Sequence, residues 1–414
     1  MAAIGTRGDV QPFIAIGKEL VARGHAVSFA TTADHRAPIE AAGLAHRSVC
    51  GNFRELMESP AGKRWVESGT PLALVKGYRE LFEPVAAAWL AELDGALRDA
   101  DAIVAHANAS GAMAVARARG IRYVVGALAG AIPTRQSPMG LPSFLNRWAH
   151  GHLLDQISKV GERAGASYLR SRGADVPRGP LWRENVKSGV LHLHLFSEHV
   201  FPFPSDWPAC AEIVGYAFLD APSTWQPPPR LVDFLSAGPK PVYVGFGSMT
   251  GMQPEQLAAL TRDALRRAKC RAVIGAGWGG MRGIDESDDV LVVDDAPHDW
   301  LFPRVAAVVQ HCGAGTVGAA LRAGRPIVAV PFFADQPVWA NIVRRLGVAP
   351  PPIPKRKLTA LRLAHALTEV TTNVDYRSRA ESIGARIRAE RGASRAADRV
   401  AQFAHGEGDV KRAG

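Results

Sequence analysis

A chain of 414 residues, 47% of them hydrophobic and 21% charged, is expected to be an ordinary globular protein of two domains. Its formal net charge of +10 could indicate nucleic acid, an anionic membrane surface or anionic substrates as partners. Because no block of Lys and Arg carries interleaved aromatic residues, we do not expect nucleic acid. A weak peripheral attraction to a membrane remains an expectation.

The N-terminus and the cysteines bear on the compartment. Arg7 and Asp9 interrupt the first residues too early for a signal peptide, and no apolar run approaches the ~20 residues of a membrane span. The four cysteines, which show no metal-site spacing, are Cys50, Cys210, Cys270 and Cys312. We therefore expect a cytoplasmic protein, at most peripheral at the inner membrane surface.

The first elements of the chain predict a parallel sheet. Residues 1–4 resemble the stub of a strand, and residues 5–8 are expected to form a tight loop. The apolar stripe from Pro12 to Ala22 predicts a helix, and Ala26 to Thr31 follows as a strand. A strand, a helix and a second strand in this order form a βαβ unit, which implies parallel pairing.

The rest of the N-terminal half continues this alternation around one long loop. The predicted elements are a helix at 33–42, mostly helical residues at 50–98, a strand at 103–105, a helix at 110–119, a strand at 121–128 and a strand at 191–196. Residues 129–150 hold several Pro and Gly, so they predict an irregular loop of the kind that carries recognition. We interpret His192 and His194 as alternation within a strand rather than as metal ligands.

A Pro-rich stretch at 219–240 is the best candidate for a stiff linker. The strand-and-helix rhythm restarts after it. The predicted elements are a strand at 242–246, a turn at Gly247 and Ser248, a helix at 254–268, strands at 271–274 and 290–293, and a helical tail at 359–403. The chain is therefore expected to hold two βαβ-rich halves.

The stretch from Val308 to Trp339 carries the clearest functional pattern. His311 and the small residues 313–315 follow a strand, and such residues let a backbone approach a ligand closely. Thr316 is placed where the next helix begins, and the free N–H groups of a helix N-terminus suit phosphate. Gly-rich turns are common, so the turn alone would be weak evidence.

Asp335 and Gln336 follow the next strand, at the edge where open α/β sheets bind ligands. A carboxylate beside an amide suits two sugar hydroxyls, because one donates to the acid and the amide can bind the other in either sense. The alternative is a helix cap with Pro337 in the first turn. A phosphate turn followed by a hydroxyl-binding pair favours a nucleotide-sugar.

This stretch resembles the donor-binding signature of the family 1, GT-B type glycosyltransferases, in the branch of sterol glucosyltransferases and bacterial natural-product glycosyltransferases. Residues 297–303 (Pro-His-Asp-Trp-Leu-Phe-Pro) and 5–13 (Gly-Thr-Arg-Gly-Asp-Val-Gln-Pro-Phe) belong to the same sterol-type signature. The resemblance implies an α/β protein with two Rossmann-like domains facing across a cleft. The expected division is an acceptor-binding domain at 1–218, the linker at 219–240, a nucleotide-sugar-binding domain at 241–385, and at 386–414 a helix returning to the first domain plus a disordered tail.

The resemblance also implies an activity: inverting transfer of a hexose, most simply glucose, from a UDP- or dTDP-sugar to a hydrophobic acceptor such as a sterol, lipid or polyketide-like aglycone. A rhamnosyl or deoxysugar transferase is the alternative. Asp9 is the implied base. The predicted donor-binding residues are Thr6, Arg7, Gly8, Gly247, Ser248, Ala296, His298, His311, Gly313, Ala314, Gly315, Thr316, Asp335 and Gln336. The predicted acceptor-binding residues are His106, Phe144 and Trp148. Neither a metal nor another cofactor is expected, because fixed donors and a helix dipole can hold a diphosphate.

Other interpretations stay open. Asp9 could cap the following helix. His106 could be a satisfied structural histidine. The N-terminal βαβ unit could belong to an NAD(P)-binding oxidoreductase, although residues 5–8 lack the third glycine of that fingerprint. A non-catalytic nucleotide-sugar binder is a further hypothesis, and the joint presence of the acid, the histidine and the acid–amide pair argues against it.

One segment departs from the family pattern. Where sterol-type relatives usually read His-His-Gly-Gly-Ala-Gly-Thr, residues 310–316 are Gln-His-Cys-Gly-Ala-Gly-Thr. Cys312 adds a side chain to the turn, and we expect it to narrow the loop or to require a negative φ, without a catalytic role. Trp278, in an earlier Gly-rich stretch, could neighbour the nucleotide base.

Overall fold

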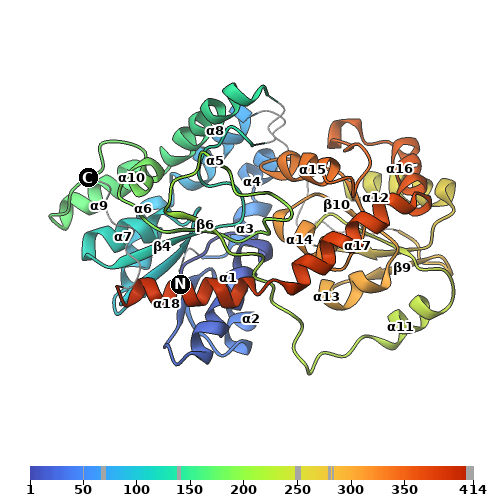
Figure 1. Cartoon of the computed structure of the whole chain (residues 1–414), viewed down its shortest axis with the longest axis horizontal. Helices are drawn as coiled ribbons and strands as arrows, with labels where there is room; N and C mark the ends of the chain where they lie inside the picture. Colours follow the sequence, from blue (N-terminus) through green and yellow to red (C-terminus); the bar gives the residue numbers. More distant parts are fainter. Residues whose placement is uncertain are drawn as a thin grey trace. The chain divides into compact units, whose positions relative to one another are not determined.

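The computed structural model describes residues 1–49, 51–66, 71–137, 141–247, 253–277, 281 and 284–406. Within these ranges the chain divides into two compact units (Figure 1). Unit 1 contains Met1–Glu198, Pro202–Leu219 and the residues from Arg391 onward, and unit 2 contains His199–Phe201 and Asp220–Glu390. Each unit has a parallel sheet covered by helices.

The first residues of the chain lie in the middle of the sheet of unit 1. Ala2 joins two groups of strands, because it bridges both Ala30 and Ala105 in parallel register. The order of strands therefore reverses at residues 1–4, and the loops that follow residue 4 and β3 emerge as neighbours at the carboxyl edge of the sheet. The first group is β1 (Ser28–Thr31) and β2 (Ala45–Ser48), and the second is β3 (Ala102–His106), β4 (Arg122–Ala127), β5 (His192–His194) and β6 (Ala211–Ile213).

Both faces of this sheet are buried, as expected for parallel strands between two helical layers. Val104 and Val124 pack with α1 and α18, whereas Ile103 and Val125 pack into the cluster on the other face. The helices of unit 1 are α1 (Arg7–Ala22), η1 (Ala33–His35), α2 (Arg36–Ala41), α3 (Phe53–Glu58), α4 (Pro60–Val66), α5 (Pro71–Phe82), α6 (Ala86–Ala96), α7 (Ser110–Arg119), α8 (Ser143–Ser158), α9 (Glu162–Ser171), α10 (Leu181–Lys187) and α18 (Gly392–Ala404).

The sheet of unit 2 has the order β11-β10-β7-β8-β9, with every pair parallel. Its direction of growth reverses between β7 (Val242–Gly245) and β10 (Val308–Gln310), so the loops after these two strands are neighbours at the carboxyl edge. The other strands are β8 (Ala272–Gly275), β9 (Val290–Val293) and β11 (Ile327–Ala329). The helices are α11 (Pro229–Ser236), α12 (Pro254–Ala268), α13 (His298–Leu301), η2 (Phe302–Arg304), α14 (Ala314–Arg322), α15 (Gln336–Arg345), η3 (Lys355–Lys357), α16 (Ala360–Thr372) and α17 (Val374–Ala389).

The last helix, α18, belongs to unit 1 and packs along α1. Arg23, at the end of α1, donates from Nε to Asp398 Oδ1 at 2.8 Å, and Arg399 pairs with Glu212. A Cβ built on Gly392 would lie 2.3 Å from the carbonyl oxygen of Tyr216, so glycine allows α18 to begin this close to the preceding backbone. The tail expected to be disordered, at 405–414, lies outside the described residues from residue 407 onward.

Several predicted boundaries are wrong. The loop expected over residues 129–150 ends early, because helix α8 begins at Ser143. Helix α1 begins at Arg7 rather than Pro12, because Thr6 and Asp9 form a capping box that starts the helix before the proline. Helix α14 begins at Ala314 rather than Thr316, with Gly313 as its N-cap. The stretch 219–240 is not only a linker, since Pro229 opens helix α11.

Within the described ranges, no helix combines the length and the apolar content needed to cross a bilayer.

Candidate active site

The reversal point of unit 1 brings an acid and a histidine together. Asp9 lies in the first turn of α1, and His106 is the last residue of β3. The distance from His106 Nε2 to Asp9 Oδ1 is 4.0 Å, and the imidazole also packs edge-on against Phe13. Burial lowers the pKa of His106, while the charge of Asp9 and the carbonyl of Ile4 oppose that shift.

The two oxygens of Asp9 have different surroundings. Oδ2 accepts hydrogen bonds from Thr6 N at 2.7 Å and from Thr6 Oγ1 at 2.9 Å, whereas Oδ1 is the oxygen that faces His106. Asp9 is therefore the third residue of α1. The helix-capping interpretation is correct for Oδ2. Arg7 and Gly8, predicted near the donor, are exposed residues of the same helical turn.

His35 fixes the loop that presents Asp9, a role that no local sequence pattern indicated. Its Nε2 lies 3.0 Å from the carbonyl oxygen of Gly5. Gly5 has a φ of 151°, and a Cβ built on it would lie 2.3 Å from Asp9 Oδ2, so glycine is required for the carboxylate to fold back over the loop.

The reversal point of unit 2 encloses a neutral histidine. His311 follows β10, and a Cβ built on Gly247 would lie 3.1 Å from His311 Cε1. A Cβ built on Gly313 would lie 2.7 Å from His311 Nε2, which is closer than real contacts of this kind. Burial lowers the pKa of His311 to about 4, and its Nδ1 is buried with no hydrogen-bond partner among the described residues. The imidazole is therefore uncharged near neutral pH.

Helix α14 presents its N-terminus beside this histidine. Val317 N donates to Gly313 O, so the N–H groups of Ala314, Gly315 and Thr316 precede the first bond within the helix. Nothing lies within 4 Å of a Cβ built on Gly315, so the space in front of this turn is open. Gln310, which the sequence marked only as a departure from the family, is buried and donates from Nε2 to Thr316 O at 3.4 Å.

Backbone strain gathers at the same edge of unit 2. Among the described non-glycine residues, Lys269, Cys312 and Ala334 have a left-handed φ, and the last two follow β10 and β11. Cys312 has a φ of 67°, so the expected negative φ is wrong. Its side chain is fully buried, and burial raises the pKa of its thiol. Strained residues of this kind often cluster at functional sites.

Asp335 and Gln336 begin α15 and also bind their own loop. Asp335 Oδ2 accepts from Trp339 Nε1 at 2.9 Å. Gln336 is buried, and its Oε1 accepts from the backbone N–H of Phe332 at 2.8 Å and of Phe333 at 3.2 Å. These two bonds fix the position of the amide oxygen. We had expected the amide to bind a sugar hydroxyl either as donor or as acceptor, and this geometry does not offer that choice.

An aromatic cluster lies beside the remaining donor residues. His298 stacks on Phe302 with ring centres 4.2 Å apart and meets the ring of Tyr243 edge-on. Ala296, two residues before His298, is buried. A Cβ on Gly245 or Gly275 would lie within 2.4 Å of the Tyr243 hydroxyl oxygen, so both glycines make room for it. Tyr243 was not identified from the sequence. Gly245, two residues after it on the same strand, is a signal that the Tyr243 side chain needs space there.

The predicted acceptor residues differ in exposure. His106 is buried beside Asp9, whereas Phe144 and Trp148 are exposed on α8. Ser248 and Trp278 lie outside the described residues. His192 and His194 are buried in β5, where His194 stacks on Trp207 with ring centres 4.0 Å apart. Over the described ranges, no group of three or more His, Cys, Asp or Glu is arranged to hold a metal ion.

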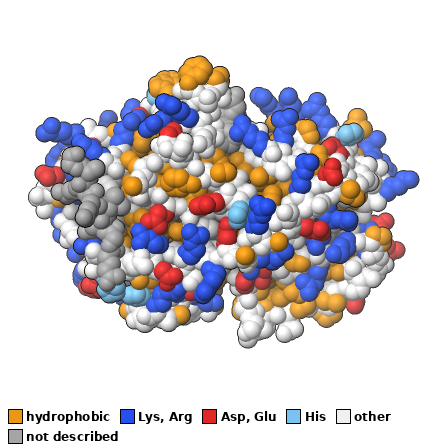
Figure 2. All heavy atoms as spheres, in the orientation of Figure 1, with side chains coloured by type: hydrophobic (Ala, Val, Ile, Leu, Met, Phe, Trp, Pro, Cys, Tyr) orange, Lys and Arg blue, Asp and Glu red, His pale blue; other side chains and the backbone are white. Residues whose placement is uncertain are grey.

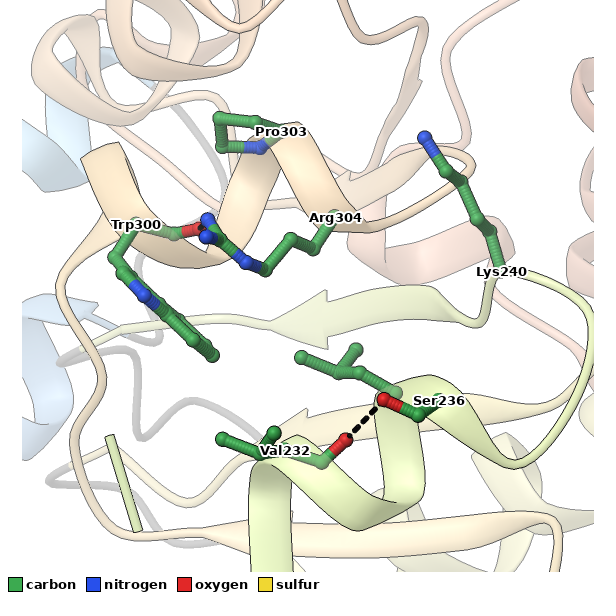
Figure 3. Close-up of a pocket in the computed structure, with 7 residues that line it drawn as sticks. Val232, Ser236, Lys240, Trp300, Pro303 and Arg304 are labelled. Carbon is green, nitrogen blue, oxygen red and sulfur yellow. Dashed lines mark hydrogen bonds between the residues drawn. The ribbon is translucent and has the colours of Figure 1, made fainter. Parts of the chain in front are cut away.

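A pocket of about 250 Å³ in unit 2 is lined by other residues (Figure 3). Val232 and Ser236 come from α11, and Trp300 and Arg304 face them, with Lys240 at the rim. The guanidinium of Arg304 lies 4.2 Å from the centre of the Trp300 ring. Lys240 and Arg304 precede β7 and β10, so this pocket opens near the amino ends of the strands, away from Gly247 and His311.

Two family models match the chain. Residues 1–135 match the glycosyltransferase family 28 N-terminal domain, and residues 283–403 match the C-terminal domain of the erythromycin biosynthesis protein CIII-like family. The fold is shared with solved bacterial glycosyltransferases. CalG4, the calicheamicin glycosyltransferase, has a TM-score of 0.72 and 20% identity, with 97% of both chains covered. Glycosyltransferase VinC in complex with dTDP has a TM-score of 0.69 and 21% identity, with 98% of both chains covered.

These likenesses define the class: the fold is GT-B, with two Rossmann-like domains, as the sequence predicted. Sterol 3-beta-glucosyltransferase UGT80A2 of Arabidopsis thaliana is 34% identical over 403 residues, which are 95% of this chain and 63% of that protein. The chain thus spans less than two thirds of that relative's length. The chain has the GT-B fold, matches the glycosyltransferase family 28 model over its N-terminal residues and resembles the sterol glucosyltransferases in sequence.

Proposed function

We propose that the protein is an inverting glycosyltransferase that moves a hexose, most simply glucose, from a nucleotide-sugar to the hydroxyl of a sterol or a similar hydrophobic molecule. The sequence likeness to a sterol 3-beta-glucosyltransferase supports both the sugar and the acceptor class. The complex of VinC with dTDP supports a diphosphate nucleotide and leaves dTDP beside UDP as the carrier.

The observation that carries the proposal is His311 at the N-terminus of α14. The imidazole of His311 is neutral, and its buried Nδ1 has no hydrogen-bond partner within the described part of unit 2. It lies beside three backbone N–H groups that precede the first hydrogen bond of the helix. Donors fixed in this way stabilise a leaving diphosphate as charge builds on it. In this proposal they supply the positive character that a metal ion would otherwise provide, so transfer needs no metal.

Asp9 is proposed to remove the proton from the acceptor. The acceptor oxygen gives its proton to Asp9 Oδ1 and forms a bond to the anomeric carbon, while the bond from that carbon to the diphosphate oxygen breaks. The electron pair of the broken bond leaves with the diphosphate. Thr6 holds Asp9 Oδ2 through two hydrogen bonds, and this fixes the direction in which Oδ1 points. Asp335 is the proposed partner of the sugar hydroxyls.

The proposal is tested by incubating the protein with UDP-glucose, dTDP-glucose and a dTDP-deoxysugar in turn, each with a panel of sterols and other hydroxylated apolar acceptors. Mass spectrometry should detect an acceptor heavier by one hexose with at least one glucose donor. Transfer only from the deoxysugar would replace glucose by the alternative sugar class. Absence of transfer from every donor, together with tight binding of NAD(P)H, would contradict the proposal.

A further inference from the structure

The pocket between α11 and the segment α13–η2 of unit 2 contains none of the residues proposed to bind the donor or to act as the base. It opens near the amino ends of the strands, whereas His311 directly follows the carboxyl end of β10. Its volume is about 250 Å³. Pockets for drug-sized ligands begin at ~300 Å³, so this one fits a molecule smaller than a nucleotide-sugar or a sterol.

The lining combines an apolar wall with positive charge. The apolar lining residues are Val232, Leu235, Trp300 and Pro303, and the polar ones are Ser236, Lys240 and Arg304. Figure 3 shows Trp300 and Arg304 on one side of the pocket and Val232 and Ser236 of α11 on the other. A small molecule with an apolar body and an anionic group would match both parts of this lining.

The acids of the lining helices do not neutralise these cations. Asp233 of α11 and Asp299 of α13 are not part of the lining, and Asp299 Oδ2 accepts from the backbone N–H of Ala221 at 3.1 Å. Arg304 donates only to a neutral group, the carbonyl oxygen of Trp300, at 2.6 Å. Over the described ranges, neither Lys240 nor Arg304 forms an ion pair with a carboxylate.

Lys240 also lies among other cations. It is exposed at the rim, yet partial desolvation of its ammonium lowers its pKa. The charges of Arg325 and Arg377 lower this pKa further, and Glu381 opposes them. Arg325 Nη2 donates to the carbonyl oxygen of Pro303 at 2.9 Å, and its buried Nε has no hydrogen-bond partner within the described part of unit 2. An anion beside Lys240 would relieve this repulsion.

Positive charge alone does not distinguish the pocket. The chain has a net charge of +10, and Lys and Arg side chains are spread over the face that Figure 2 shows. The pocket differs from this general surface because its cations lack a carboxylate partner and lie beside an aromatic wall. The guanidinium of Arg304 is 4.2 Å from the centre of the Trp300 ring.

The segment α13–η2 connects this pocket with a residue predicted to bind the donor. His298 is the first residue of α13 and stacks on Phe302, with ring centres 4.2 Å apart. Trp300 and Arg304 belong to the same segment and line the pocket. Since residues 298–304 form continuous helical turns, a constraint at Arg304 is carried to His298 by one rigid element.

We propose that this pocket is an effector site for a small organic anion, a carboxylate or a phosphate ester with an apolar body. The apolar body packs against Val232 and Trp300, and the anionic group lies between Lys240 and Arg304. The bound anion holds α13–η2 in one position and thereby tightens nucleotide binding at the donor site. The effect on the nucleotide rests on the proposed function, whereas binding of the anion does not.

Binding is tested by isothermal titration of benzoate and of phenyl phosphate into the full chain without nucleotide. At least one of them should bind with a Kd of about 1 mM or tighter. Benzamide has the shape of benzoate without its charge, and it should bind at least about tenfold more weakly than benzoate if the carboxylate is the group recognised. The tighter of the two probes tells a carboxylate site from a phosphate site.

Two variants locate the binding. Arg304→Gln removes a charge from the pocket and Ser236→Trp fills it from α11, so each should weaken binding of the tighter probe at least about tenfold. Ser236 is exposed, so the fold should hold, and thermal unfolding checks this. The matched control is Arg362→Gln, an exposed base on α16, which packs against α12, and it should bind like the wild type. Absence of binding by both probes, or equal binding by the wild type and both variants, would overturn the proposal.

The effector role is tested by titrating UDP with and without the tighter probe at saturation. The wild type should bind UDP at least about threefold more tightly with the probe, and Ser236→Trp should show no difference. An unchanged UDP affinity in a wild type that binds the probe would overturn the effector role. A wild type that binds the probe but neither UDP nor dTDP would contradict the proposed function and the effector role together, and the anion site alone would stand.

Discussion

Each of the two units has a histidine at the carboxyl end of a strand beside its reversal point: His106 is the last residue of β3, and His311 directly follows β10. The two histidines have different neighbours. His106 of unit 1 faces a carboxylate, Asp9 Oδ1, at 4.0 Å. His311 of unit 2 faces glycines and the start of α14, and burial lowers its pKa to about 4 with no opposing charge. The same sheet topology therefore supports two electrostatic environments.

This difference shows how one architecture can serve two chemical tasks. A carboxylate beside a buried imidazole suits proton removal, whereas a neutral imidazole beside free N–H groups suits an anion. Strain follows the same division, because the described non-glycine residues with left-handed φ all belong to unit 2. Six experiments test this difference between the two units, in order of decreasing expected effect.

Asp9→Asn should lower kcat by roughly 10²–10⁴-fold, because an amide cannot accept the acceptor proton. Radiolabelled donor measures the turnover. The control is Thr6→Ala, which removes one side of the same capping box and should lower the melting temperature by a few degrees, for about 1 kcal/mol, while keeping the carboxylate. If Asp9→Asn turned over as fast as Thr6→Ala, unit 1 would not supply the base.

His311→Ala should lower kcat by roughly 10²–10³-fold, since one fixed donor to the leaving group is lost. Addition of imidazole should restore part of the rate by refilling the space. His365→Ala, on the exposed face of α16, is the matched control and should leave the rate unchanged. An unchanged rate in His311→Ala would mean that the diphosphate leaves elsewhere.

Acid should weaken the fold through His311. The pKa of His311 is about 4 in the folded chain and near 6.5 in the unfolded chain. Between these pH values the imidazole is protonated in the unfolded chain and neutral in the folded chain, so acid favours unfolding. The stability from this residue is present above pH 6.5, and about 3 kcal/mol is lost as the pH falls to 4. Urea unfolding of the wild type and of His311→Ala at pH 7 and pH 5 isolates the loss that comes from this residue, because burial also lowers the pKa of His192 to about 4 and of His194 to about 3.

NMR titration of the wild type and of Asp9→Asn measures the pKa values of the two histidines separately. Asp9→Asn removes the charge that raises the pKa of His106, so that pKa should fall, while the pKa of His311 should stay the same. A shift of His311 instead would contradict the separation of the two sites.

Gly313→Ala and Gly315→Ala should weaken donor binding for different reasons, each by about tenfold, or ~1.4 kcal/mol. A Cβ at 313 would meet His311 Nε2 at 2.7 Å, so the imidazole must move and the protein should also lose stability. A Cβ at 315 meets nothing within 4 Å, so only a bound ligand would feel it and the melting temperature should hold. Gly165→Ala, also in open space but on α9, is the control. Equal donor affinity in the wild type and Gly315→Ala would mean that no ligand reaches this turn.

Ala334→Gly should stabilise unit 2 by about 0.5–1 kcal/mol, because the exposed Ala334 has a φ of 56° and glycine adopts this conformation without strain. Ala401→Gly in α18 is the opposite control, with a loss of about 1 kcal/mol. Denaturant unfolding compares both with the wild type. A loss of stability in Ala334→Gly would show that the loop is not strained.

The sequence was sufficient for the alternation of strands and helices, because apolar strands and Gly-terminated helices have local signals. It was not sufficient for the start of α1. Pro12 resembled a first-turn proline, yet Thr6 and Asp9 had already begun the helix, and α1 accepts the proline inside it. Asp can take the place of the Glu or Gln that usually completes a capping box.

Contacts between distant residues were beyond the sequence. Asp9 and His106 meet only because residues 1–4 and β3 are adjacent strands, a fact of topology rather than of local pattern. The left-handed φ of Cys312 was missed for a related reason, since the turn between β10 and α14 imposes it against the local preference.

The central claim is that the two reversal points divide the reaction, with proton removal in unit 1 and diphosphate binding in unit 2. Isothermal titration of UDP and dTDP into wild type, Asp9→Asn and His311→Ala tests it most directly. The account predicts that Asp9→Asn binds the better nucleotide like the wild type, while His311→Ala binds it at least about tenfold more weakly. Weaker binding in Asp9→Asn together with unchanged binding in His311→Ala would contradict it.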